Sequence, residues 1–104
     1  MIDLTRPVPC LKFIGAPFSD QLAHVGAEVR EASIAYGDYV AAEYNGDAAA
    51  QAQEKEHLAE ELTDVITAAT TALEMLGYDK VERESLQILV NEKNRRRGYW
   101  GEAE

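Results

Sequence analysis

The chain has 104 residues, of which 46% are hydrophobic, and a formal net charge of −9. This length corresponds to one domain, and so short a domain leaves much apolar surface uncovered, so we expect a homodimer or homotetramer. The acidic charge argues against a protein that holds nucleic acid through its overall field. It leaves room for a small anionic ligand, because a bound cation can invert the local charge.

The single cysteine, Cys10, cannot form an internal disulfide, which suits a reducing compartment. No apolar run approaches the length of a membrane span, and residues 1–12 lack the charged start and apolar core of a signal peptide. We therefore expect a cytoplasmic protein with no membrane partner.

Residues 1–17 contain three prolines and no sustained periodicity, which predicts an extended arm. Ser19 or Asp20 offers an N-cap for a first helix, which should end before the turn signal Asn45-Gly46. The apolar residues of this helix recur at helical spacing; they are Leu22, Val25, Val29, Ala32, Tyr36, Tyr39 and Val40.

Asp47 can cap a second helix that reaches to Gly77, where glycine suits the position just past a helix end. Asp79 and Glu82 resemble a capping box that opens a third helix, which should run into residues 93–97 before Gly98. The sequence therefore predicts an all-α fold, a helical hairpin plus a third helix, which forms a four-helix-bundle-type core on oligomerisation. Residues 18–100 make up the domain, and residues 101–104, with Glu102 and Glu104, form a solvated tail.

Two pairs of acidic residues lie three positions apart, Glu28 with Glu31 and Glu61 with Asp64. Residues at this spacing share a helix face. In each pair one acid lies about 70° and the other about 130° from the centre of the apolar stripe of its helix. If the two helices pack antiparallel, the edges that carry these pairs can meet and bring four carboxylates together.

Four carboxylates in one small pocket repel each other unless a cation neutralises them. Ligand sets made only of oxygen favour hard ions, so we expect Mg²⁺, with Mn²⁺ as a substitute, rather than zinc. The alternative interpretation is that these acids are solvated residues beside a core. A third pair, Asp79 and Glu82, is assigned to the helix cap.

The order of these motifs resembles a known family. Glu28-Val-Arg-Glu31 followed by Glu60-Glu61-Leu-Thr-Asp64 is similar to the ExxE…ExxD signature of the MazG-like nucleoside triphosphate pyrophosphohydrolases, within the all-α NTP pyrophosphatase superfamily. The basic segment Asn91–Tyr99 resembles the one that closes that domain. The interval between Glu31 and Glu61 is at the long end for the family, and we place the extra length in Tyr44–Gln53.

The resemblance implies a dimer or a dimer of dimers that hydrolyses NTPs or dNTPs to the monophosphate and pyrophosphate. It also implies that Glu28, Glu31, Glu61 and Asp64 bind magnesium. Glu31 lies farther around its helix from the core than Glu28 does, so we assign it the role of general base as well.

Lys93 and Arg97 continue the apolar stripe of the third helix, and Asn94 and Arg96 flank it. Cations in this position can reach the phosphates, which would make Lys93 a catalytic residue and Lys93, Asn94 and Arg97 substrate-binding residues. The alternative is that they serve the helix dipole. Trp100 is a candidate for stacking on the base, whereas Tyr36 and Tyr39 are interpreted as core or interface residues.

Glu54 and His57 have the spacing of a di-iron motif, but those sites need a second copy of it. We therefore interpret His57, and likewise His24, as exposed residues or residues that contact a metal ligand from outside. Two other functions stay open. One is a non-catalytic acidic helical module that serves oligomerisation or acts as an adaptor. The other is a phosphoribosyl-ATP pyrophosphohydrolase-type enzyme, which shares the fold and the chemistry.

Overall fold

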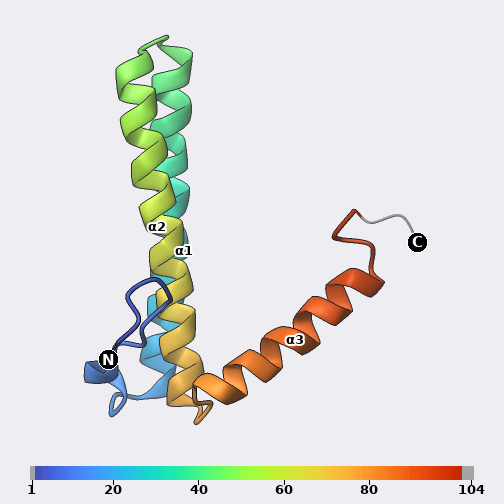
Figure 1. Ribbon diagram of the computed structural model, residues 1–104. Helices are drawn as coiled ribbons and strands as arrows, with labels where there is room; N and C mark the ends of the chain where they lie inside the picture. Colours follow the sequence, from blue (N-terminus) through green and yellow to red (C-terminus); the bar gives the residue numbers. More distant parts are fainter. Residues whose placement is uncertain (1, 102–104) are drawn as a thin grey trace.

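The computed structural model describes residues 2–101, and in that range it contains three α-helices and no strand (Figure 1). α1 spans Phe18–Tyr44, α2 spans Ala48–Met75 and α3 spans Lys80–Arg96, and a short 3₁₀ helix, η1, spans Leu11–Phe13. The expected all-α class is confirmed. Met1 and the expected tail beyond Gly101 lie outside the described residues.

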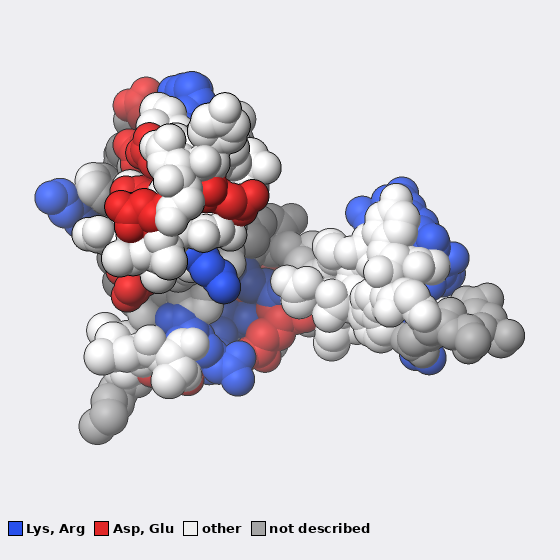
Figure 2. Space-filling model, turned by 90° about the horizontal axis from the view of Figure 1, so that it is seen from above, with Lys and Arg blue, Asp and Glu red and all other residues white. Residues whose placement is uncertain are grey.

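The two long helices form a hairpin from which the third helix departs. α1 and α2 lie side by side along their length, and α3 leaves the end of α2 and extends away from both (Figures 1 and 2). The hairpin plus third helix is therefore present within one chain. None of the helices in residues 2–101 has both the length and the apolar character needed to cross a bilayer.

The helix ends follow the local signals in the sequence. The Asp47 carboxylate accepts a hydrogen bond from the Ala50 N–H at 3.1 Å, and Asp79 and Glu82 form the expected capping box. Gly77 has φ +94°, and the next residue, Tyr78, donates its N–H to the Leu73 carbonyl at 3.1 Å. This is the Schellman arrangement, in which a left-handed glycine lets the chain turn back and satisfy the last carbonyls.

The start of α1 and the arm differ from the sequence-based prediction. α1 is capped at Pro17, which is not helical, and the helix begins at Phe18 rather than after Ser19 or Asp20. Proline suits this position because its fixed φ is compatible with helix entry and the first N–H groups of a helix have no internal partner. The arm also contains η1, so it is not extended throughout.

The turn between α1 and α2 contains only residues 45–47. Residues 48–53, where we expected extra loop length, belong to α2 instead. Any extra length between the two acidic pairs is therefore accommodated as additional helix, which keeps both helices continuous on either side of the tip. This follows from composition, because the segment is rich in alanine, the strongest helix former.

The hairpin closes on small side chains and not on the large apolar residues of the sequence stripes. α1 contributes Gln21, Ala32, Ala35 and Ala42 to the buried set, and α2 contributes Ala68, Thr71 and Ala72. Small residues let two helices approach closely. Of the apolar stripe expected on the first helix, Ala32 is buried and Val25 and Tyr39 are partly buried within the chain. The other members of the stripe are exposed; they are Leu22, Val29, Tyr36 and Val40.

The larger apolar side chains are left on the surface of the isolated chain. Val29, Tyr36, Leu62 and Ile66 are each about half exposed, and α3 exposes 60% of Leu89. A compact monomer of 11.5 kDa exposes about 5,800 Å², whereas this chain exposes 7921 Å². The excess is larger than the roughly 800 Å² that each partner buries in a standard interface. We propose that further copies of the chain cover this surface.

We predict that light scattering at micromolar concentration gives two or four times the chain mass of 11.5 kDa. Leu62→Glu should shift the protein toward the monomer, because it places a charge in the proposed contact. Thr63→Glu, at the exposed neighbouring position, should leave the mass unchanged. A monomeric wild-type protein would contradict the proposal.

Candidate metal centre

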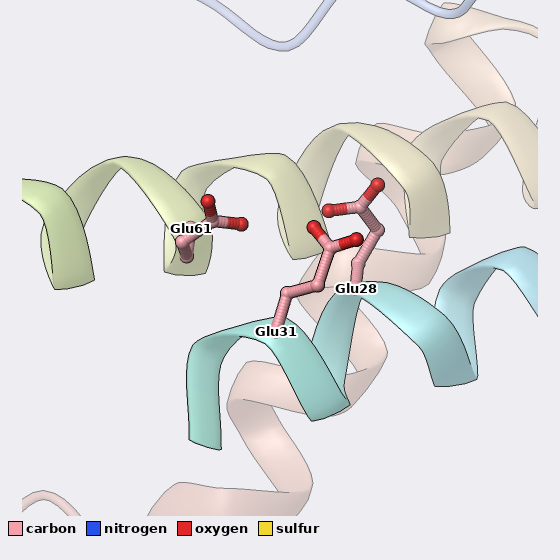
Figure 3. A group of neighbouring side chains, drawn as sticks. All are labelled: Glu28, Glu31 and Glu61. Atoms are coloured by element: carbon pink, nitrogen blue, oxygen red, sulfur yellow. The ribbon is translucent and has the colours of Figure 1, made fainter. Parts of the chain in front are cut away.

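Three of the four predicted acidic residues meet between α1 and α2. Glu28 and Glu31 extend from α1 toward α2, and Glu61 extends from α2 toward them (Figure 3). Each offers a carboxylate oxygen, and these three oxygens lie within 4.8 Å of one another. We call these three residues the acid cluster. Glu28 and Glu61 are largely buried in the helix interface, whereas Glu31 lies at its exposed edge.

Asp64, the fourth predicted ligand, lies one turn further along α2 than Glu61. It is exposed, and it borders a small cavity that Glu28 also lines. Its charge acts on Glu28, where it helps to raise the pKa. Asp64 therefore lies beside the acid cluster rather than within it, on the side where a ligand can approach.

Each of the two buried glutamates has a histidine one helical turn before it. His24 Nε2 lies 3.3 Å from Glu28 Oε1, and His57 Nε2 lies 3.2 Å from Glu61 Oε1. Both histidine side chains are about half exposed. The two helices therefore present the same local arrangement, in which a surface histidine holds one oxygen of an inner carboxylate and restricts its orientation.

The second oxygen of each inner carboxylate has no such partner. Glu28 Oε2 and Glu61 Oε2 are both buried, and among the described residues neither accepts a hydrogen bond. Burial raises the pKa of Glu28, and the charges of Glu31, Asp64 and Glu61 raise it further, while His24 acts in the opposite direction. A buried carboxylate oxygen without a partner is costly, so this site favours a proton or a cation.

A divalent cation fits this donor set. Glu28 Oε2 and Glu61 Oε2 offer unpaired oxygens from two helices, and Glu31 and Asp64 are accessible from solvent next to them. Such a set of oxygens suits Mg²⁺ or Mn²⁺ rather than a metal that prefers nitrogen or sulfur. His24 and His57 already contact the carboxylates, as is common for groups that orient metal ligands.

The predicted substrate-binding residues lie elsewhere in the chain. Lys93 and Asn94 are in the last turns of α3, Arg97 caps it and Trp100 follows it, and this end of α3 lies away from the hairpin (Figure 1). The guanidinium of Arg95 lies 5.6 Å from the centre of the Trp100 ring. Within one chain, the structure does not bring these residues to the acid cluster.

His24 and His57 were expected to be exposed or to contact a metal ligand from outside, and they lie half exposed against Glu28 and Glu61. Sequence reasoning missed two features of the site. The first is the position of Asp64 beside the acid cluster, since all four acids were expected to lie together. The second feature is the arm, whose residues Cys10 and Phe13 line the cavity beside Glu28 and Asp64. Proline content predicted an arm but not its position.

The chain matches no protein-family model, no curated protein and no solved structure. The interpretation of the acid cluster therefore depends on its geometry and on the residues themselves.

The raised pKa of Glu28 predicts how stability changes with pH in the metal-free protein. The folded protein holds this proton more tightly than the unfolded chain does, so the Glu28 contribution to the free energy of unfolding falls as pH rises from the unfolded pKa through the folded one. Glu28→Gln should remove this contribution and be the more stable protein at neutral pH.

Urea unfolding in a chelator, from about pH 4 to about pH 8, measures the difference between wild type and Glu28→Gln. Glu60→Gln, at the exposed position beside Glu61, serves as the control. If the wild type and Glu28→Gln showed parallel pH profiles, Glu28 would not be destabilised by its surroundings.

Proposed function

We propose that this protein is a divalent-metal-dependent pyrophosphohydrolase of nucleoside or deoxynucleoside triphosphates. The observation that carries the proposal is the pair of buried, unpartnered oxygens of Glu28 and Glu61, with Glu31 beside them. The resemblance of the ExxE…ExxD pattern to the MazG-like enzymes supports the choice of substrate, and Mg²⁺ is the proposed cofactor.

We assign different roles to the acidic residues of the site according to their burial. Glu28 and Glu61 are enclosed between the helices and would hold the cation, and Glu31 and Asp64 would complete its ligand set. A bound Mg²⁺ would neutralise the triphosphate and lower the pKa of water. Glu31 is exposed, and in this proposal it would accept a proton from an attacking water as general base.

A second copy of the chain would supply the cations for the phosphates. Residues 18–76 carry 12 acidic and 2 basic residues, whereas residues 93–97 carry 4 basic residues. Figure 2 shows most acidic side chains on the hairpin, with some basic ones among and below them, and basic side chains along the edges of the outer part of α3. Because α3 leaves its own hairpin and exposes Leu89 and Val90, packing of this face on another chain would carry Lys93 and Arg97 with it.

Removal of one buried charge should abolish the activity. Glu61→Gln keeps the shape of the side chain but loses the charge that binds the metal, so pyrophosphate release from NTPs and dNTPs with Mg²⁺ should fall to background. Asp64→Asn should also reduce turnover, and circular dichroism should show both variants to be helical. Near-normal turnover in both would rule out the metal site, and an inactive wild type across the whole panel would favour the non-catalytic helical module.

Loss of Lys93 should reduce activity without unfolding the protein. If Lys93 pairs with a phosphate oxygen, Lys93→Ala removes a charge-assisted interaction worth about 1.5–3 kcal/mol, and kcat/KM should fall by about ten- to a hundredfold. Thermal stability should barely change, since Lys93 is exposed near a helix end and alanine favours helix. Unchanged kinetics would remove Lys93 from the site.

Mixing Glu61→Gln with Lys93→Ala distinguishes a lysine supplied by a second chain from one supplied within the chain. In a dimer of one Glu61→Gln chain and one Lys93→Ala chain, exchange across the interface leaves one site with both residues intact. Unfolding and refolding the two variants together should then restore about a quarter of wild-type activity for a randomly mixed dimer. If the mixture never exceeds the average of its parents, Lys93 acts in its own chain.

A further inference from the structure

A small cavity lies between the N-terminal arm and the hairpin, directly beside the acid cluster. Its volume is about 170 Å³, and Glu28 and Asp64 form part of its wall. Cys10 and Phe13 of the arm form another part of the wall, and His24 also lines it. A ligand that is bound at the acid cluster and is longer than the cluster would therefore extend into this cavity and contact the arm.

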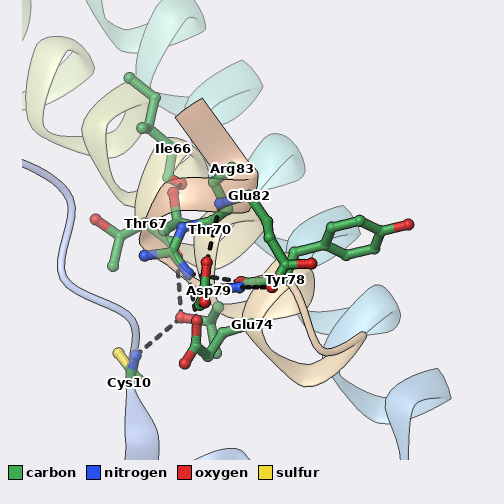
Figure 4. A network of polar contacts seen from close by, with 10 residues as sticks. Cys10, Ile66, Thr67, Thr70, Glu74, Tyr78, Asp79, Glu82 and Arg83 are labelled. Carbon is green, nitrogen blue, oxygen red and sulfur yellow. Dashed lines mark hydrogen bonds and ion pairs between the residues drawn. The ribbon is translucent and has the colours of Figure 1, made fainter. Parts of the chain in front are cut away.

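Specific hydrogen bonds fix the arm in this position. The Cys10 N–H donates to Thr71 Oγ1 at 2.9 Å, and Thr71 in turn donates to the Thr67 carbonyl at 3.0 Å. The first of these bonds is the dashed line that leaves Cys10 in Figure 4. Thr71 is only 1% exposed. Beyond Cys10 the chain turns through η1, where the Phe13 N–H donates to the Cys10 carbonyl at 3.0 Å. The turn that carries Phe13 is thus anchored to a buried residue of α2.

The walls of the cavity differ in chemistry. The hairpin contributes the carboxylates of Glu28 and Asp64, whereas the arm contributes an aromatic ring, Phe13, which is 40% exposed. The Lys12 ammonium lies 5.4 Å from the centre of that ring. A ligand that suits both walls has a metal-bound polyanion at one end and a flat apolar group at the other, since aromatic rings stack on nucleobases.

The size of the cavity limits what it can hold. Whole small-molecule sites usually enclose about 300–1,000 Å³, so a cavity of 170 Å³ takes only part of a ligand. With the phosphates at the acid cluster, the part that remains is the nucleoside. Phe13, with Lys12 beside it, is the group on the arm that can contact a base.

We propose that the N-terminal arm forms the subsite for the nucleoside half of the substrate, with Phe13 as the residue that stacks on the base and thereby sets substrate preference. This inference rests on the proposed function. Thr71 lines the cavity but is only 1% exposed, so in this scheme it is a positioning residue, whose hydroxyl holds the arm through Cys10.

The test compares Phe13→Ala and Thr71→Val with the wild type on a panel of NTPs and dNTPs. Thr63→Val is the matched control, because the Thr63 hydroxyl donates a hydrogen bond within α2, to the Ala59 carbonyl, and does not hold the arm. Both test variants should raise KM for nucleotides about tenfold or more and reduce the preference between purine and pyrimidine substrates. Two further readouts are the inhibition constant of inorganic triphosphate, which lacks a nucleoside, and the affinity for Mn²⁺, and both should stay at the wild-type value.

Every other outcome contradicts either the proposed arm subsite or the proposed function. If the wild type hydrolyses nucleotides but Phe13→Ala leaves KM and preference unchanged, the arm subsite is wrong and the proposed function stands. If the nucleotide KM and the triphosphate inhibition constant rise together, Phe13 supports the whole site rather than the nucleoside, and the inference is also wrong. If the wild type binds neither Mn²⁺ nor any nucleotide, the proposed function is wrong, and so is the inference that rests on it. Phe13→Ala decides the question even if Thr71→Val does not fold, because Phe13 is not buried.

Discussion

Two carboxylate oxygens, Glu28 Oε2 and Glu61 Oε2, are enclosed between α1 and α2, and no group in residues 2–101 donates a hydrogen bond to either. Buried negative charge is tolerated only when something compensates for it. Here the histidines His24 and His57 hold only the other oxygen of each group. The small side chains that line the rest of the interface make this enclosure possible, because they let the helices approach until the glutamates meet. The two buried carboxylates thus lower the stability of the hairpin, and a cation bound between them would restore it.

The use of small residues inside the hairpin has a second consequence: many of the large apolar side chains lie on the outer surface of the chain. Alanines dominate the buried contact of the hairpin, whereas large apolar side chains such as Val29 and Leu62 remain about half exposed. We propose that another chain packs on this surface. α3 has a comparable exposed face, and its angle to the hairpin is fixed at the junction, where Arg83 bonds to Glu74 and to the Tyr78 carbonyl (Figure 4). The radius of gyration of 16.9 Å exceeds the value of about 13 Å typical of a compact chain of this length. The chain is therefore less compact than is usual for its length. We propose that further copies of the chain pack on these exposed faces and bring the cations to the proposed site.

Much of the fold was predictable because its signals are local. Asp47, Gly77 and the Asp79/Glu82 box each act within a few residues, and the helices begin and end there as expected. The meeting of the acidic pairs followed from helical geometry together with an antiparallel hairpin. The helix faces that pack against each other could not be predicted from the periodicity. Periodicity is judged by hydrophobicity, which is higher for leucine and valine than for alanine, whereas a close helix contact favours small side chains. The direction of α3 and the position of the arm depend on single long-range contacts, such as Cys10 with Thr71, which leave no pattern in the sequence.

The most direct test of the metal site is anomalous diffraction from crystals grown with Mn²⁺. We predict a strong peak between α1 and α2, within bonding distance of Glu28 and Glu61 and adjacent to Glu31. Crystals of Glu61→Gln grown in the same way should lack this peak. A peak at other surface carboxylates, with none between the two inner glutamates, would contradict the account. In that case the enclosed oxygens would be held by protons, and the acid cluster would be a structural feature of the hairpin rather than a metal centre.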